Sequence, residues 1–79
     1  MQVTIQYFAI LREQRGLSSE EIQTASKTAG ELYEDRRTRC NLSMPGSSLR
    51  FAVNDEFVSA DHPLCQGDIV AFISPVAGG

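Results

Sequence analysis

The stretch that decides the fold is Ile69-Val70-Ala71-Phe72-Ile73-Ser74-Pro75-Val76-Ala77-Gly78-Gly79. Residues 69–73 form an apolar run rich in β-branched and aromatic side chains, which is typical of a short buried strand. Ser74-Pro75 ends this strand, because proline has no N–H to donate to a sheet and biases the residue before it toward extended backbone. The sequence therefore predicts a strand that passes directly into a short tail ending on two glycines.

This tail, residues 75–79, has two interpretations. It can be a frayed terminus, since the last residues of most domains are poorly ordered. It can also carry the reactive group of the protein, the carboxylate of Gly79. Glycine has no side chain, so the thin backbone of Gly78 and Gly79 can enter a narrow cleft in another protein. The place of the two glycines after a strand and a Pro-Val-Ala spacer favours the second interpretation.

Length and composition predict one small domain over residues 1–79. An apolar fraction of 42% is ordinary for a globular domain, and a net charge of −3 gives no support to nucleic-acid binding. We find no apolar run long enough to span a membrane and no secretory signal, so we expect a cytoplasmic protein. Cys40 and Cys65 match no zinc-site spacing and are expected to be reduced and without a chemical role.

The first third of the chain predicts a strand, a short helix and a second strand. Residues 2–7 alternate polar and apolar, and Phe8 then falls on the polar face, either covered by a local element or exposed for a partner. Residues 9–14 have helix-forming composition, and this helix is expected to end near Gly16. Residues 17–25 fit either a helix start or an edge strand. We favour a strand paired with the first.

The middle of the chain predicts the main helix. Thr28 and Glu31 have the Ser/Thr-x-x-Glu spacing in which hydroxyl and carboxylate each accept from a free backbone amide. The inner positions of this helix are expected to be Leu32, Tyr33 and Cys40. The arginines near its end, Arg36, Arg37 and Arg39, are expected to be solvated and to complement the helix dipole.

The remaining chain predicts a loop followed by strands. Residues 41–48 contain Pro-Gly and form a turn-rich loop, and residues 49–53 and 56–58 form a hairpin around a turn at Asn54-Asp55. Helices that come early must cover one face of a mixed sheet, which predicts an α+β roll. The first and last strands are expected to pair in parallel at the sheet centre. This is the β-grasp arrangement of ubiquitin-like proteins.

The sequence predicts no catalytic site, metal site or bound cofactor in this chain. His62 is a lone histidine beside a proline, and is more typical of a turn than of a metal site. The adjacent carboxylate pairs, Glu20-Glu21 and Asp55-Glu56, diverge on a strand, unlike the facing carboxylates of acid–base catalysis. These patterns favour a carrier or a binding partner.

Several segments resemble one known family, the small subunits of molybdopterin synthase. The resemblance lies at both ends of the chain and is less specific over residues 17–48. It rests on Val3-x-Ile5-x-Tyr7-Phe8-Ala9, Leu11-Arg12-Glu13, Phe51-Ala52-Val53-Asn54, Val58-Ser59, Asp61-His62-Pro63-Leu64, Gly67-Asp68, Val70-Ala71-Phe72 and Pro75-Val76-Ala77-Gly78-Gly79.

This resemblance implies a β-grasp sulfur carrier whose Gly79 carboxylate is the reactive group. An adenylating enzyme of the ubiquitin-activating type would use ATP to activate that carboxylate, and sulfur would replace the AMP to give a thiocarboxylate. Two such chains would serve a dimeric large subunit in a heterotetramer, which builds the dithiolene of molybdopterin. The catalytic groups would belong to the large subunit. Pro75, Val76, Ala77 and Gly78 would thread the terminus into its active site.

Docking of such a carrier also requires an apolar surface. If Val70 and Phe72 face the core, then Ile73 faces outward beside Phe8. We therefore predict an apolar docking patch formed by Phe8, Ile73, Pro75 and Val76. The alternative is that the early helix covers Phe8.

Three other functions are compatible with the sequence. The sulfur carrier of thiamine synthesis shares the fold and the Gly-Gly end, although Pro-Val-Ala and the Asp-His-Pro-Leu turn favour the molybdopterin type. A protein modifier would be joined to target lysines through Gly79. Lys27 is the one lysine of the chain, which argues against varied chains built on itself. A plain interaction module would have an inert tail.

Overall fold

The computed structural model describes residues 1–74. Within this range the chain forms a mixed sheet of five strands with two helices, in the α+β arrangement predicted from the sequence. In chain order the elements are β1 (Gln2–Tyr7), α1 (Ala9–Arg15), β2 (Ser19–Gln23), α2 (Ala29–Cys40), a 3-10 turn η1 (Gly46–Ser48), β3 (Arg50–Val53), β4 (Glu56–Val58) and β5 (Ile69–Ile73).

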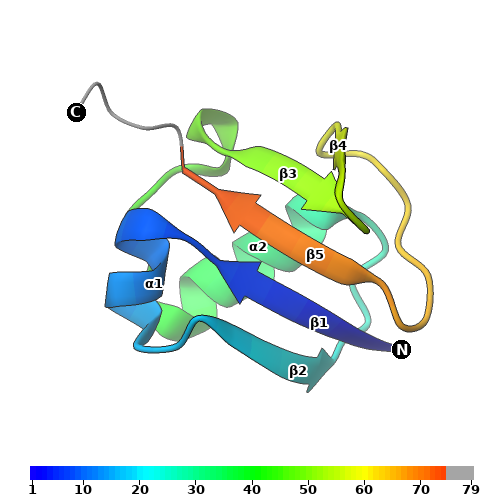
Figure 1. Ribbon diagram of the computed structural model, residues 1–79, viewed down its shortest axis with the longest axis horizontal. Coiled ribbons are helices and arrows are strands. Elements are labelled where there is room, and N and C mark those ends of the chain that lie inside the picture. The colour runs from blue at the N-terminus through cyan, green and yellow to red at the C-terminus, as the bar shows by residue number, and fades with distance from the viewer. Residues whose placement is uncertain (75–79) are drawn as a thin grey trace.

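The sheet has the strand order β2-β1-β5-β3-β4, so β5 is its central strand (Figure 1). β5 pairs in parallel with β1, with Tyr7 opposite Phe72, and antiparallel with β3. The predicted parallel pairing of the first and last strands is therefore confirmed. Residues 17–25 contain the favoured strand, since β2 pairs antiparallel with β1.

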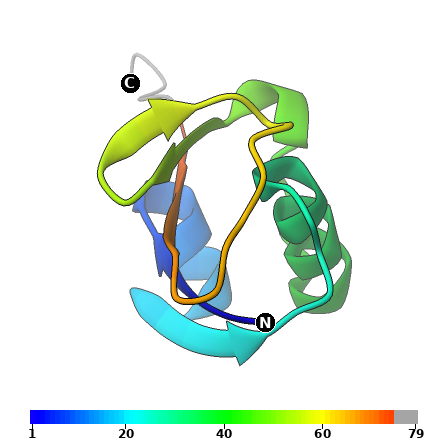
Figure 2. The same cartoon turned by 90° about the vertical axis from the view of Figure 1, so that its right-hand side faces the viewer.

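Helix α2 lies across one face of the sheet, and α1 lies at the end where β1 finishes (Figures 1 and 2). Phe72 of β5 is fully buried beneath α2, at the centre of an aromatic cluster. Its ring makes edge-on contacts with Tyr33 at 5.0 Å and with Tyr7 and Phe51 at 5.9 Å, measured between ring centroids. The core therefore fixes β5, the strand that leads into the tail.

The N-terminus of α2 is held by its own side chains and by a distant loop. Thr28 Oγ1 accepts a hydrogen bond from the Glu31 amide at 3.2 Å, as predicted. The Glu31 carboxylate accepts from the amide of Lys27, one residue before the cap, so both side chains of the predicted pair accept from a backbone amide. The amides of Ala29 and Gly30 donate to the carbonyls of His62 and Ala60. The segment around His62 therefore has a structural role here.

Two turns follow the sequence signals closely. Gly16 ends α1 with a left-handed φ of 77°, a conformation that costs glycine little. Asn54 and Asp55 both have positive φ, 51° and 71°, as a two-residue hairpin turn of the primed type requires.

Loop 41–48 also contains the turn η1, which the sequence analysis missed, and β3 begins at Arg50, one residue later than predicted.

A charged cluster inside the fold joins four elements. Glu20 of β2 points toward the helices and accepts hydrogen bonds from Tyr7 Oη at 2.6 Å and from Arg15 Nε and Nη2 at 2.9 and 2.8 Å. Arg36 of α2 lies 4.0 Å away. Arg36 is only 14% exposed, so the prediction of a fully solvated arginine end was wrong at this position. An inward charge also protects the exposed edge of β2 from pairing with other chains.

Replacement of Glu20 by glutamine is expected to lower the free energy of unfolding by about 2–3 kcal/mol at pH 7, since it leaves Arg15 and Arg36 without their anion. Burial alone would raise the pKa of Glu20. The hydrogen bonds from Arg15 and Tyr7 and the charges of both arginines outweigh burial and lower that pKa. The stabilisation is therefore complete above the ordinary glutamate pKa of about 4.3 and is lost as the pH falls through the lower folded value.

Urea unfolding at pH 7 and pH 3 tests this expectation. The difference between wild type and E20Q should shrink at the lower pH. The matched control is Glu21→Gln, on the opposite face of the same strand, which contacts Gln2 at 3.3 Å and should change stability little. An E20Q penalty that is equal at both pH values would show that the charge of Glu20 is not the stabilising feature.

Candidate functional site: the end of the central strand

The predicted reactive tail follows β5, the central strand of the sheet, in the sequence. β5 has neighbours on both sides, and Ser74, directly after it, is buried at 6% exposure. The tail residues Pro75, Val76, Ala77, Gly78 and Gly79 lie outside the described residues. The structure therefore defines the point from which the tail starts and the surface around that point.

Phe8 lies at this end of the sheet. Tyr7 pairs with Phe72, so one further step along the parallel strands brings Phe8 to the level of Ile73. Phe8 keeps extended backbone, with φ −129° and ψ 151°, and therefore faces away from the buried Tyr7 side. Ala9 then turns the chain sharply into α1 with an unusual φ of +53°. Phe8 is 42% exposed, so α1 does not cover it, while Ile73 is half-buried.

The sheet face opposite α2 continues this surface over β5, β3 and β4, although its two alanines, Ala71 and Ala52, are only 7% and 8% exposed. Gln6, Ala71, Ala52 and Phe57 stand in one cross-strand row on β1, β5, β3 and β4. Phe57 is 69% exposed, the largest exposed fraction among the large apolar side chains described. We call Phe8, Ala52, Phe57, Ala71 and Ile73 the sheet-face patch.

The sequence analysis missed Phe57. It lies thirteen residues before Val70 and eighteen before the first residue of the tail, and only the pairing order β1-β5-β3-β4 brings it to the same face as Ile73. One feature of the sequence could have indicated its exposure. Phe57 lies in a three-residue strand directly after a tight hairpin turn, where an aromatic side chain has few neighbours to pack against. Arg50 flanks it, with its guanidinium carbon 5.7 Å from the Phe57 ring centroid.

No group of three His, Cys, Asp or Glu side chains in residues 1–74 is arranged to hold a metal ion. The most perturbed titrating groups form the Glu20 cluster, where burial and the Glu20 hydrogen bond raise the pKa of Tyr7. That cluster joins secondary-structure elements inside the fold. In the same range, no helix has the length and apolar character needed to cross a bilayer.

Comparison with known proteins gives relatives over almost the whole chain. The molybdopterin synthase sulfur carrier subunit of Escherichia coli K12 is 36% identical over 80 residues, covering 98% of this chain and 99% of that protein. A structure of the putative molybdopterin converting factor subunit 1 of Pyrococcus furiosus superposes with a TM-score of 0.77 at 28% identity, covering 95% and 98% of the two chains.

A third likeness concerns the fold. One chain from the complex of subunits 1 and 2 of the Helicobacter pylori molybdopterin-converting factor superposes with a TM-score of 0.62 at 21% identity, with both chains covered completely. These structures share the β-grasp arrangement described above. The model of the ThiS family matches residues 5–79, which include the tail. With this match and the E. coli relative, we conclude that the chain belongs to the ThiS family.

Proposed function

We propose that this chain is the sulfur-carrier subunit of a molybdopterin synthase and that the carboxylate of Gly79 carries the sulfur. The observation that supports this most is the end of β5. The central strand of the sheet ends at buried Ser74, from which the sequence continues directly into the Gly-Gly tail, and the exposed Phe8 and half-buried Ile73 lie beside this point. The name of the E. coli relative supports the same function.

The proposed chemistry begins with activation by another enzyme. A carboxylate is a poor electrophile, so an adenylating enzyme of the ubiquitin-activating type joins Gly79 to AMP, with release of pyrophosphate from ATP. A sulfur donor then displaces AMP and leaves a thiocarboxylate. This chain binds no cofactor in the proposal, and it is a co-substrate of the synthase whose catalytic groups lie in the large subunit.

The sheet-face patch is the proposed contact with the large subunit. Its aromatic side chains, Phe8 and Phe57, are the kind that supply most binding energy at protein interfaces when they become buried. Arg50, beside Phe57, is suited to an acidic group on the partner. The Helicobacter pylori relative was solved as a complex of subunits 1 and 2, which supports a partner of this kind. Pro75 and Val76 would extend the contact toward the active site.

Ile73→Glu is expected to weaken binding to the large subunit at least about tenfold, since a charge would be buried against an apolar surface. The measurement is titration calorimetry with the large subunit of the same organism. Ile69→Glu is the matched control, because Ile69 lies on the same strand and face but about 13 Å from Ile73. Full affinity of I73E would contradict the proposed docking patch.

A complementation experiment tests the proposed pathway. The chain should restore molybdenum-enzyme activity to an E. coli strain that lacks its molybdopterin synthase sulfur carrier subunit. The parallel control is a strain that lacks the sulfur carrier of thiamine synthesis, which should still require thiamine. Rescue of the second strain alone would assign the chain to thiamine synthesis and contradict the proposal.

A further inference from the structure

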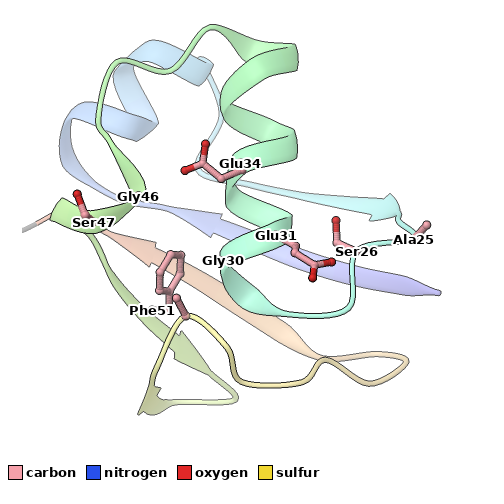
Figure 3. A pocket seen from close by; sticks show the side chains of 9 residues that line it. Ala25, Ser26, Gly30, Glu31, Glu34, Gly46, Ser47 and Phe51 are labelled. Carbon is pink, nitrogen blue, oxygen red and sulfur yellow. The ribbon is translucent and has the colours of Figure 1, made fainter.

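A groove of about 740 Å³ lies beside the N-terminal half of α2, bounded by η1, β3 and the loop that follows β4 (Figure 3). We call it the α2 groove. Phe51 forms its floor and faces the helix, so the groove opens on the helix side of the sheet and away from the sheet-face patch. Its volume falls within the range of about 300–1,000 Å³ usual for ligand sites. It is therefore a second surface, separate from the proposed docking patch.

The apolar part of the groove is built into the fold. Phe51 is 4% exposed and is held by edge-on contacts with Tyr33 and Phe72. The Gly30 amide donates to the Ala60 carbonyl at 2.7 Å, and a Cβ at Gly30 would lie only 3.0 Å from Ala60. Glycine at position 30 therefore permits the loop after β4 to lie against the helix. The floor is preorganised and needs no rearrangement to receive an apolar group.

One wall of the groove carries negative charge. Glu31 and Glu34 lie three residues apart on α2 and both line it. Within residues 1–74, Glu31 forms no ion pair, although one of its oxygens accepts from the Lys27 amide, and Glu34 forms one ion pair, at 3.4 Å from Arg37. The described residues that line the groove include no lysine or arginine. The groove therefore combines an aromatic floor with carboxylates that an incoming cation can pair with.

We propose that the α2 groove binds an arginine-bearing apolar segment of a partner protein. A guanidinium can donate to two carboxylates at once while the apolar stem of its side chain packs over the groove floor, which a lysine does less well. Charge complementarity argues against the carboxylate terminus of a second copy and against nucleic acid, both of which Glu31 and Glu34 would repel. The groove lies on the helix side of the sheet and the sheet-face patch on the other, so the inference stands independently of the proposed function.

Amide chemical-shift mapping of the full chain with a blocked peptide, acetyl-Leu-Arg-Phe-amide, tests this site. Shifts are expected at Gly30, Glu31, Glu34, Gly46 and Ser47, with a Kd of about 1 mM for so small a probe. Acetyl-Leu-Glu-Phe-amide should bind at least about fivefold more weakly. Glu31→Gln combined with Glu34→Gln should weaken the arginine peptide by a similar factor, as two exposed charge pairs predict.

Two variants separate groove binding from general charge and folding effects. Glu13→Gln with Glu56→Gln makes the same change in net charge away from the groove and should leave binding unchanged. Ser47→Trp should fill the groove and abolish the shifts without changing any charge. Equal binding of the two peptides, shifts at the sheet-face patch instead, or retained binding in S47W would each overturn the proposal. Chemical-shift changes at the groove residues that grow with protein concentration, in the absence of peptide, would also overturn the proposal, because they would identify a second copy of the chain as the occupant.

Discussion

Deletion of Gly79 is expected to abolish sulfur transfer, with a loss of at least about 10³-fold in the rate of dithiolene formation by the reconstituted synthase. The proposed reactive carbon belongs to Gly79, and removing this residue withdraws the terminus by about 3.5 Å. Displacement of a reacting group by about 1 Å can already cost about 10²-fold. The measurement is single-turnover product formation with the adenylating enzyme, ATP, a sulfur donor and the large subunit.

The deletion should leave docking through the sheet-face patch measurable, so affinity for the large subunit is the control that separates chemistry from binding. Gly79→Ala gives a graded comparison. Its terminus has full length, and an added Cβ should slow transfer without removing it, because the proposed function requires the tail to enter narrow sites in two enzymes. Full activity of the Gly79 deletion would assign the tail no chemical role and return the chain to the class of interaction modules.

Phe72→Ala is expected to lower the free energy of unfolding by about 3–5 kcal/mol, the usual cost of removing a fully buried aromatic ring. Phe72 is 0% exposed and contacts three other rings. A domain of this size has a total stability of only about 5–15 kcal/mol. The strand that leads into the tail would then be weakly held, and the variant should be partly unfolded at 37 °C.

The matched control is Phe57→Ala, the same chemical change on the exposed face of the same sheet. Phe57 is 69% exposed and contacts Arg50, so its loss should cost less than about 1 kcal/mol. Urea unfolding followed by circular dichroism measures both variants. Similar losses for the two phenylalanines would show that the ring cluster around Phe72 is not the centre of the core.

Local sequence patterns were sufficient to predict most of the framework. Alternation predicted β1, Gly16 predicted the end of α1, and Asn54-Asp55 predicted the hairpin, because each of these depends on residues close together in the chain. The same reasoning placed Val70 and Phe72 inward and Phe8 outward, and the structure confirms these orientations.

Features that depend on sheet order could not be predicted in this way. Glu20 meets Tyr7 and Arg36 only because β2 pairs with β1 in one register and α2 packs above them. Phe57 joins the surface near Ile73 only because β3 lies between β4 and β5. The α2 groove depends on the close approach of Ala60 to Gly30, which are thirty residues apart. These are long-range contacts, which propensity and periodicity do not encode.

The most direct test of the central proposal is the intact mass of the chain after incubation with its adenylating enzyme, ATP and a sulfur donor. The proposal predicts a mass gain equal to the exchange of one oxygen for sulfur, located in the C-terminal peptide and absent from the Gly79 deletion. An unchanged mass would contradict it, provided that the same enzyme preparation releases pyrophosphate when the chain is present. A mass gain that survives deletion of Gly79 would equally contradict it, because the sulfur would then lie elsewhere.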